Sequence, residues 1–281
     1  MNKLIGLLCV IACSVPSTFA QSVNALDQLK AGDFKLVEDS FSALQSEFEQ
    51  GLKTEYDLFD AYKVFYQRDD VFRPQLNQWI ERYPKSSSAY LARGIYFRKL
   101  GEFRRGSDYV DKVKNENMEY MEEMFELAKK DLRTSLRIDQ KSYLAVLHLL
   151  NIAQFEGDDR AAREYLVLGS TAYPGNFLVR ARYLIHLTPK WGGSYTAMDT
   201  FIESCRSQGM PPDKINLLSA IKFDDQGHSA QEQGQTEQAR SAYANALALS
   251  RSSGPRFRQD YLQYSLQICR EPQNSSKEYC R

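Results

Sequence analysis

The chain has 281 residues, 43% of them hydrophobic, which is enough for one large domain or one continuous array of repeats around an extended core. Its 36 basic and 36 acidic residues cancel, so the charge gives no reason to expect nucleic acid or an anionic membrane as a general partner. The 9 prolines and 15 glycines are too few for a disordered or low-complexity chain.

The first twenty residues have the pattern of a signal peptide. A lysine precedes an apolar run over residues 4–15, and cleavage is expected after the small residue Ala20. This run is too short to remain as a membrane-spanning helix. We therefore expect a periplasmic or secreted protein with one domain over 21–270 and a tail over 271–281. In an alternative interpretation, the residues VIAC that end at Cys13 form a lipoprotein box, and a lipid on that cysteine anchors the protein.

Two amphipathic segments follow the leader. Apolar residues recur at three- and four-residue steps between Phe34 and Phe48, which predicts a helix. Residues 54–84 predict a pair of helices in which Trp79 faces the core and Pro84 ends the second helix.

Glycines at regular spacing come next. Gly94 and Gly106 stand about twelve residues apart, which predicts two antiparallel helices that touch at these glycines and turn at Gly101. Beyond Gly106, apolar residues recur without a helix breaker as far as Leu132, which predicts one long helix near residues 106–138 that projects past its neighbours. Its methionines are expected to pack in the core, and the alternative is an adaptable surface that binds a partner.

The same arrangement recurs twice more along the chain. Gly157 marks a predicted turn, Ala162 opens the following helix, and Pro174 ends it. A later segment repeats the design with Gly227, Gly234, Ala239, Tyr243 and Ala246. A period of about 34 residues over roughly 54–250 resembles the tetratricopeptide repeat. This resemblance implies an all-α fold, a tetratricopeptide-like α-solenoid of antiparallel helix pairs.

One stretch, TPKWGGSYTAMDTF at residues 188–201, interrupts these helices. A predicted helix over 177–187 is stopped by Pro189, and Ser194 is the expected N-cap of the next helix. The stretch is therefore predicted to be an enlarged turn in which Trp191 folds over the helix ends as an apolar plug. In the alternative, Trp191 is an exposed aromatic at the rim of a binding groove.

Three cysteines remain beyond the leader. Cys269 and Cys280 flank a short polar segment that can bend back, so a disulfide between them is expected to add about 3 kcal/mol in the chain-entropy model. In the alternative, Cys205 is buried and inert while both tail thiols are free. The spacing matches no zinc-binding pattern.

A second resemblance extends over about residues 70–205. The segments LARGIYFRKLGEFRRG, AKKDLRTSLRID and LTPKWGGS together resemble a family of exported bacterial proteins of unassigned function. Two Arg-Gly dipeptides followed by a Trp-Gly-Gly carry this resemblance. It implies a helical, tetratricopeptide-like fold and no established activity.

Catalytic and metal-binding patterns are missing from the sequence. His148, His186 and His228 are far apart, and none belongs to an HExxH-type motif. His148 and His186 lie on apolar helices and are expected to be core residues with satisfied hydrogen bonds. There is no GxSxG nucleophile elbow and no phosphate-binding GxxxxGK[ST] loop. We therefore expect no enzyme, no cofactor and no metal.

Function is expected to follow from shape, because the first helix of each pair in a solenoid lines the inner surface where partner chains bind. The residues predicted to lie on or near that surface are Arg98, Lys99, Asn151, Gln154, Arg182, Thr188, Trp191, His228 and Gln231. The cations among them suit an extended peptide with acidic or carboxylate groups. The sequence thus predicts an exported, non-catalytic binding module or adaptor. The alternative is an immunity protein that occludes the active site of a secreted toxic enzyme.

Overall fold

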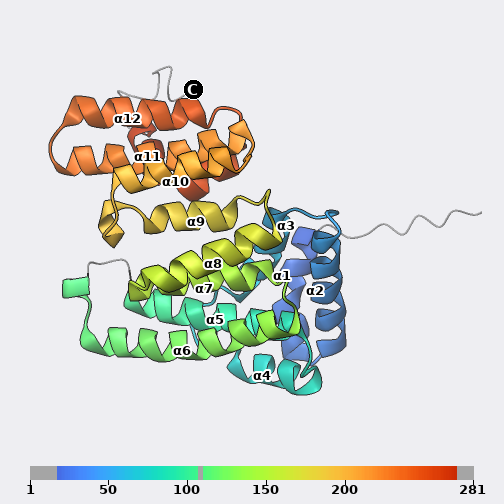
Figure 1. Cartoon of the computed structure of the whole chain (residues 1–281). Coiled ribbons are helices and arrows are strands. Elements are labelled where there is room, and N and C mark those ends of the chain that lie inside the picture. Colours follow the sequence, from blue (N-terminus) through green and yellow to red (C-terminus); the bar gives the residue numbers. More distant parts are fainter. Residues whose placement is uncertain (1–17, 107–109, 271–281) are drawn as a thin grey trace, which may run out of the picture.

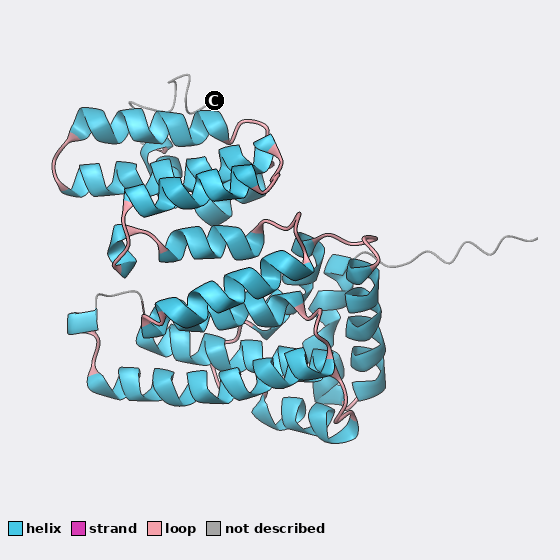
Figure 2. Ribbon diagram, viewed as in Figure 1, coloured by secondary structure: helices cyan, strands magenta, loops and turns pink. Residues whose placement is uncertain are grey.

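The computed structural model describes residues 18–106 and 110–270, which form fourteen α-helices and three short 3₁₀ helices (Figures 1 and 2). These two ranges contain no strand, which confirms the all-α prediction. No helix within them is long and apolar enough to cross a membrane. Most of the predicted signal peptide, the tail over 271–281 and Cys280 lie outside the described residues.

The N-terminal third is built around a cluster of aromatic side chains. Its helices are α1 (Thr18–Ala31), α2 (Phe34–Glu49), α3 (Glu55–Tyr62), η1 (Lys63–Phe65) and α4 (Arg73–Arg82). Trp79 is fully buried against Phe41 and Phe65, as predicted. Its indole Nε1 donates a 2.8 Å hydrogen bond to Glu38, so the polar edge of this core aromatic is also satisfied.

The next pair of helices corrects three sequence predictions. α5 (Ser87–Arg105) runs straight through Gly101, which lies against Met124 and Phe125 of α6 (Asn115–Ile138) rather than at a turn. Gly106 ends α5 with φ 79° and does not face Gly94. The long helix predicted near residues 106–138 is shorter in the structure: α6 has 24 residues and begins at Asn115. The single turn η2 (Val110–Lys112) precedes it.

Gly94 has no side chain, and this lets α5 and α6 approach closely. A Cβ built on Gly94 would lie 2.7 Å from Leu132 of α6, closer than real side chains approach. The adjacent Arg93 also joins α5 to α6, through an ion pair with the buried Asp131. Arg93 Nε lies 2.7 Å from Asp131 Oδ2, and Nη2 lies 2.9 Å from Oδ1. Met121 is buried in this interface, so the methionines of α6 contribute to the core as expected.

Further helices follow α6 along the chain. They are α7 (Tyr143–Glu156), α8 (Asp159–Ala172), α9 (Leu178–His186), η3 (Pro189–Trp191), α10 (Tyr195–Ser207), α11 (Pro212–Glu232) and α12 (Thr236–Leu249). α7 packs on α8 and α11 on α12, while α5, α7, α9 and α11 contact one another in that order. In Figure 1 the helices from α6 to α12 accordingly lie one above another, with α1 and α2 beside the lower half.

Glycines confirm two of the predicted turns. Gly157 and Gly234 follow α7 and α11 with φ 67° and 75°, a conformation that side chains other than glycine resist. In the last pair, Gly227 lies against the ring of Tyr243, which a Cβ would approach to 2.5 Å. The close contact between these two helices therefore depends on a residue without a side chain.

Two buried carboxylates cap helices that lie far along the chain. Glu55 of α3 accepts hydrogen bonds from Phe177 N (2.7 Å) and Leu178 N (2.9 Å) at the start of α9. Asp224 of α11 accepts from Ser265 N at 2.7 Å, near the start of α14 (Gln263–Cys269). Each carboxylate satisfies amides that the helix itself leaves unpaired, so α3 fixes α9 and α11 fixes α14.

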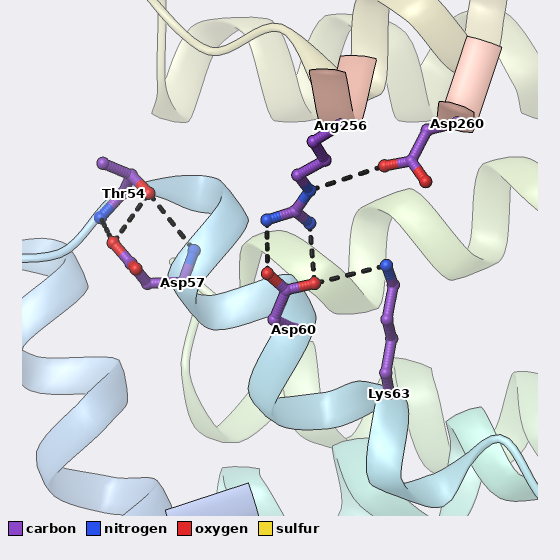
Figure 3. A network of polar contacts seen from close by, with 6 residues as sticks. All are labelled: Thr54, Asp57, Asp60, Lys63, Arg256 and Asp260. Carbon is purple, nitrogen blue, oxygen red and sulfur yellow. Dashed lines mark hydrogen bonds and ion pairs between the residues drawn. The ribbon is translucent and has the colours of Figure 1, made fainter. Parts of the chain in front are cut away.

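The C-terminal segment returns to the first third of the chain. Arg256 on α13 (Pro255–Tyr261) forms a two-pronged ion pair with Asp60 of α3, and Nη2 lies 2.7 Å from Oδ1 (Figure 3). Phe257 and Tyr261 pack edge-on against Phe177, next to α9. α13 thus joins α3 to α9.

Candidate functional site

Four of the predicted binding residues come together where α5, α7 and α9 pack side by side. Arg98 and Lys99 come from α5, Gln154 from α7, and Arg182 from α9. The packing of the three helices brings together the sides of each helix that carry these residues. We call these four residues, together with Glu102, Tyr66 and His148, the cation cluster.

Glu102 is the centre of the cation cluster. One carboxylate oxygen lies 2.6 Å from Arg98 Nη1, and Lys99 Nζ lies 3.0 and 2.9 Å from the two oxygens. Arg182 is placed differently, since its Nη1 donates a 3.4 Å hydrogen bond to Gln154 Oε1. Two cations therefore contact a single carboxylate, and the charge of Arg182 acts on that carboxylate from a greater distance.

Burial makes this excess of positive charge significant. The side chains of Arg98, Lys99 and Glu102 are only 4%, 11% and 27% exposed. Burial, with the Arg98 charge beside it, lowers the pKa of Lys99 to about 8. Burial opposes ionisation of Glu102, but Arg98 and Lys99 outweigh it and lower the pKa of that carboxyl to about 2. Glu102 is thus ionised at every physiological pH, and Lys99 is the member that titrates near neutrality.

Two neutral aromatic side chains complete the cation cluster. Tyr66, just after η1, lies under Lys99 Nζ, which is 4.5 Å from its ring centroid. His148 of α7 packs edge-on against that tyrosine at 6.0 Å. Burial and the charges of Arg98, Lys99 and Arg182 hold the pKa of His148 well below its ordinary value, so the ring is neutral.

The expectation that His148 and His186 are satisfied core residues is wrong for His148 and holds for only one nitrogen of His186, whose buried Nδ1 has no hydrogen-bond partner among the described residues. His148 is 1% exposed, and neither ring nitrogen has a hydrogen-bond partner among the described residues. His186 Nε2 lies 2.9 Å from Asp159 Oδ1. Asn151 binds its own helix, with Nδ2 donating to Leu147 O at 2.9 Å.

Sequence reasoning missed Glu102, Tyr66 and His148 as members of the cluster. Glu102 had a recoverable signal, because a glutamate three and four residues after Lys99 and Arg98 reaches both on a helix. Tyr66 had none, since it follows the short η1 turn and reaches α5 only through the tertiary fold.

The enlarged turn around Trp191 lies between α9 and α10. Gly192 has φ 87°, and a Cβ on Gly193 would lie 2.1 Å from Leu187 O, so both glycines are needed for this bend. Ser194 caps α10 by accepting from Ala197 N, as predicted. The half-buried Trp191 ring packs edge-on against Phe155 of α7 at 5.3 Å. Trp191 therefore packs on α7, while its predicted role as a plug over the ends of its own helices remains a prediction.

The other predicted surface residues lie outside the cation cluster. His228 stacks on Tyr264 of α14 with ring centroids 3.8 Å apart, beside a cavity of about 210 Å³. Gln231 borders the same cavity and accepts a hydrogen bond from Tyr243. Thr188 is buried and donates to Ile185 O. Cys205 is a free, buried thiol, whereas the pairing of Cys269 with Cys280 remains a prediction.

Replacing Trp191 with alanine is expected to lower the free energy of unfolding by about 2 kcal/mol, because a half-buried indole leaves its contact with Phe155. Urea unfolding monitored by circular dichroism measures this loss. Binding of an acidic peptide to the folded variant should stay within twofold of the parent. Unchanged stability together with a tenfold weaker complex would instead identify Trp191 as a rim aromatic.

The cation cluster has the chemistry of an anion-binding site. Arginine and lysine donors converge on carboxylate groups, and low local dielectric strengthens such contacts. Within residues 18–106 and 110–270, no group of three or more His, Cys, Asp or Glu side chains is placed to hold a metal ion. Comparison of the chain with family models, with curated proteins and with solved structures finds no match.

Proposed function

We propose that this protein is an exported, non-catalytic binding module that holds an acidic partner polypeptide on the inner face of a tetratricopeptide-like helical array. The observation that carries the proposal is the charge of the cation cluster, in which Arg98 and Lys99 share one carboxylate and Arg182 donates to the neutral amide of Gln154. The signal-like first twenty residues support export.

An excess of positive charge with little solvent costs free energy unless an anion neutralises it. In the cation cluster, Glu102 offsets only one of three cations, and Arg98 is almost fully buried. An acidic side chain of a partner would offset a second charge. Binding of the partner would then offset part of the unfavourable electrostatic free energy of these buried cations.

The succession of inner helices supports a polypeptide as the partner. α5, α7, α9 and α11 contact one another in order, which matches the row of first helices that lines the inner surface of a repeat array. Gln154 adds a buried amide next to Arg182. The cations would select the acidic residues of an extended chain.

Replacing Arg182 with glutamine is expected to weaken binding of a fluorescein-labelled, Glu-rich peptide at least tenfold, because one of the cluster's three cations is lost. Fluorescence anisotropy at fixed salt measures the dissociation constant. The matched control is Arg133→Gln, which removes the same charge from an exposed position on α6. Equal affinities for Glu-rich and Gln-rich peptides, or equal losses in the two variants, would contradict the proposal.

A further inference from the structure

The ion pairs of Glu102 differ from the other contacts in the cation cluster because they are local. Glu102 lies on the same helix as Lys99 and Arg98, three and four residues further on. It stands in the last turn of α5, which ends at Arg105, and its side chain is more exposed than those of both cations. A rotation of this side chain toward solvent requires no movement of the packed helices.

Arg182 shows the opposite arrangement. It reaches the cluster from α9, and its described contact is a long hydrogen bond to the neutral amide of Gln154. Among the described residues, no carboxylate lies within ion-pair distance of its guanidinium. Arg98 Nε and both ring nitrogens of the buried His148 also lack hydrogen-bond partners within the described part of the chain. The cluster therefore offers more donors than Glu102 uses.

From these contacts we propose that Glu102 is an internal occupant of a carboxylate-binding site formed by Arg98, Lys99 and Arg182, and that a partner's carboxylate competes with it. The inference rests on the proposed function, because it specifies the group that the same surface binds. When an external carboxylate bridges Lys99 and Arg182, Glu102 releases Lys99 and keeps its ion pair with Arg98.

The identity of the occupant supports a carboxylate as the ligand. The cations already hold one carboxylate with hydrogen bonds of 2.6–3.0 Å, so their spacing suits a group of that shape. A second carboxylate leaves the cluster with three positive and two negative charges. Glu102 thus lowers the affinity of the site for other carboxylates, because it is on the same helix as Arg98 and Lys99 and competes with any incoming group for them.

Glu102→Gln tests the competition because it predicts a gain rather than a loss. The variant keeps the size of the side chain and removes its charge. We expect N-acetylglutamate amide, a small probe with a single carboxylate, to bind the variant about tenfold more tightly than the parent in isothermal titration. The control Glu122→Gln removes an exposed glutamate on α6 and should leave the affinity unchanged. Equal or weaker binding to Glu102→Gln would overturn the inference.

A second measurement on the unaltered protein keeps the test independent of the variant's folding. Carbon-13 NMR of the lysine Cε groups follows the protonation of Lys99, whose pKa burial and the Arg98 charge hold at about 8. Saturating probe should raise this pKa, because the added negative charge favours the ammonium form. An unchanged titration would show that the probe binds elsewhere.

The pH dependence follows from the groups that face Lys99. These are Arg98 and Glu102 on its own helix, His148 and Gln154 on α7, Arg182 on α9, Tyr66 after η1, and Tyr261 on α13 near Arg182. Only Lys99 changes charge between pH 7 and 9, because His148 is already neutral and the tyrosines titrate higher. Probe affinity should therefore fall as the pH rises through about 8. A flat profile from pH 7 to 9 would contradict the role of Lys99.

Peptide probes identify the source of the carboxylate. One peptide has an internal glutamate and an amidated C-terminus, and another has a free C-terminus and no acidic side chain. Tighter binding of either to Glu102→Gln than to the parent supports competition and identifies the carboxylate that enters. If N-acetylglutamate amide shows the expected gain but neither peptide binds, the carboxylate site stands and the polypeptide function is wrong.

Discussion

Replacing Glu55 with alanine is expected to lower the free energy of unfolding by about 4 kcal/mol, because three buried donors lose their acceptor. These donors are the amides of Phe177 and Leu178 and the hydroxyl of Tyr143, all within 2.9 Å of the carboxylate. Urea unfolding followed by both circular dichroism and tyrosine fluorescence measures the change.

Glu122→Ala provides the matched control, since this glutamate is exposed on α6 and should alter stability by less than about 0.5 kcal/mol. Glu55→Gln is expected to recover only part of the loss, because its amide nitrogen replaces one acceptor by a donor. A Glu55→Ala protein as stable as the control would show that α9 does not depend on this cap.

The second large effect is expected at Gly94. Gly94→Leu should destabilise the protein by about 3 kcal/mol or more, because a Cβ at this position already lies 2.7 Å from Leu132 and 3.2 Å from its backbone nitrogen. The helices α5 and α6 must separate to admit the longer side chain. Thermal melting and urea unfolding report the loss.

Gly254→Leu serves as the comparison for this substitution. Gly254 has φ −63°, which any residue adopts, and no atom within 4 Å of a built Cβ. The same change in sequence should therefore have a small effect at Gly254 and a large one at Gly94. Similar melting temperatures for the two variants would contradict the close contact of α5 with α6.

Features set by neighbouring residues were predictable from the sequence. The turns at Gly157 and Gly234 and the N-cap at Ser194 depend on local backbone geometry. The grouping of polar residues from α5, α7 and α9 follows from helical periodicity once the helices pack in order. Local patterns therefore identified much of the cation cluster, although not its carboxylate.

The errors arose where the same residue type serves two purposes. Gly101 fits a turn or a close helix contact equally well in sequence, and only the proximity of Met124 and Phe125 distinguishes the two. The cap of α9 by Glu55 spans more than a hundred residues, and nothing near Glu55 indicates its partners. Such contacts depend on the complete fold and leave no periodic signal.

The return of α13 to α3 changes how the chain is expected to unfold. In an open array of helix pairs, each pair contacts only its neighbours, so the ends can detach independently. Here Arg256 and Asp60 join positions 196 residues apart. The final helices cannot leave without exposing Phe177 and loosening the first third of the chain. This long-range closure favours a single cooperative transition and slows folding, because a large loop must form before the contact stabilises anything.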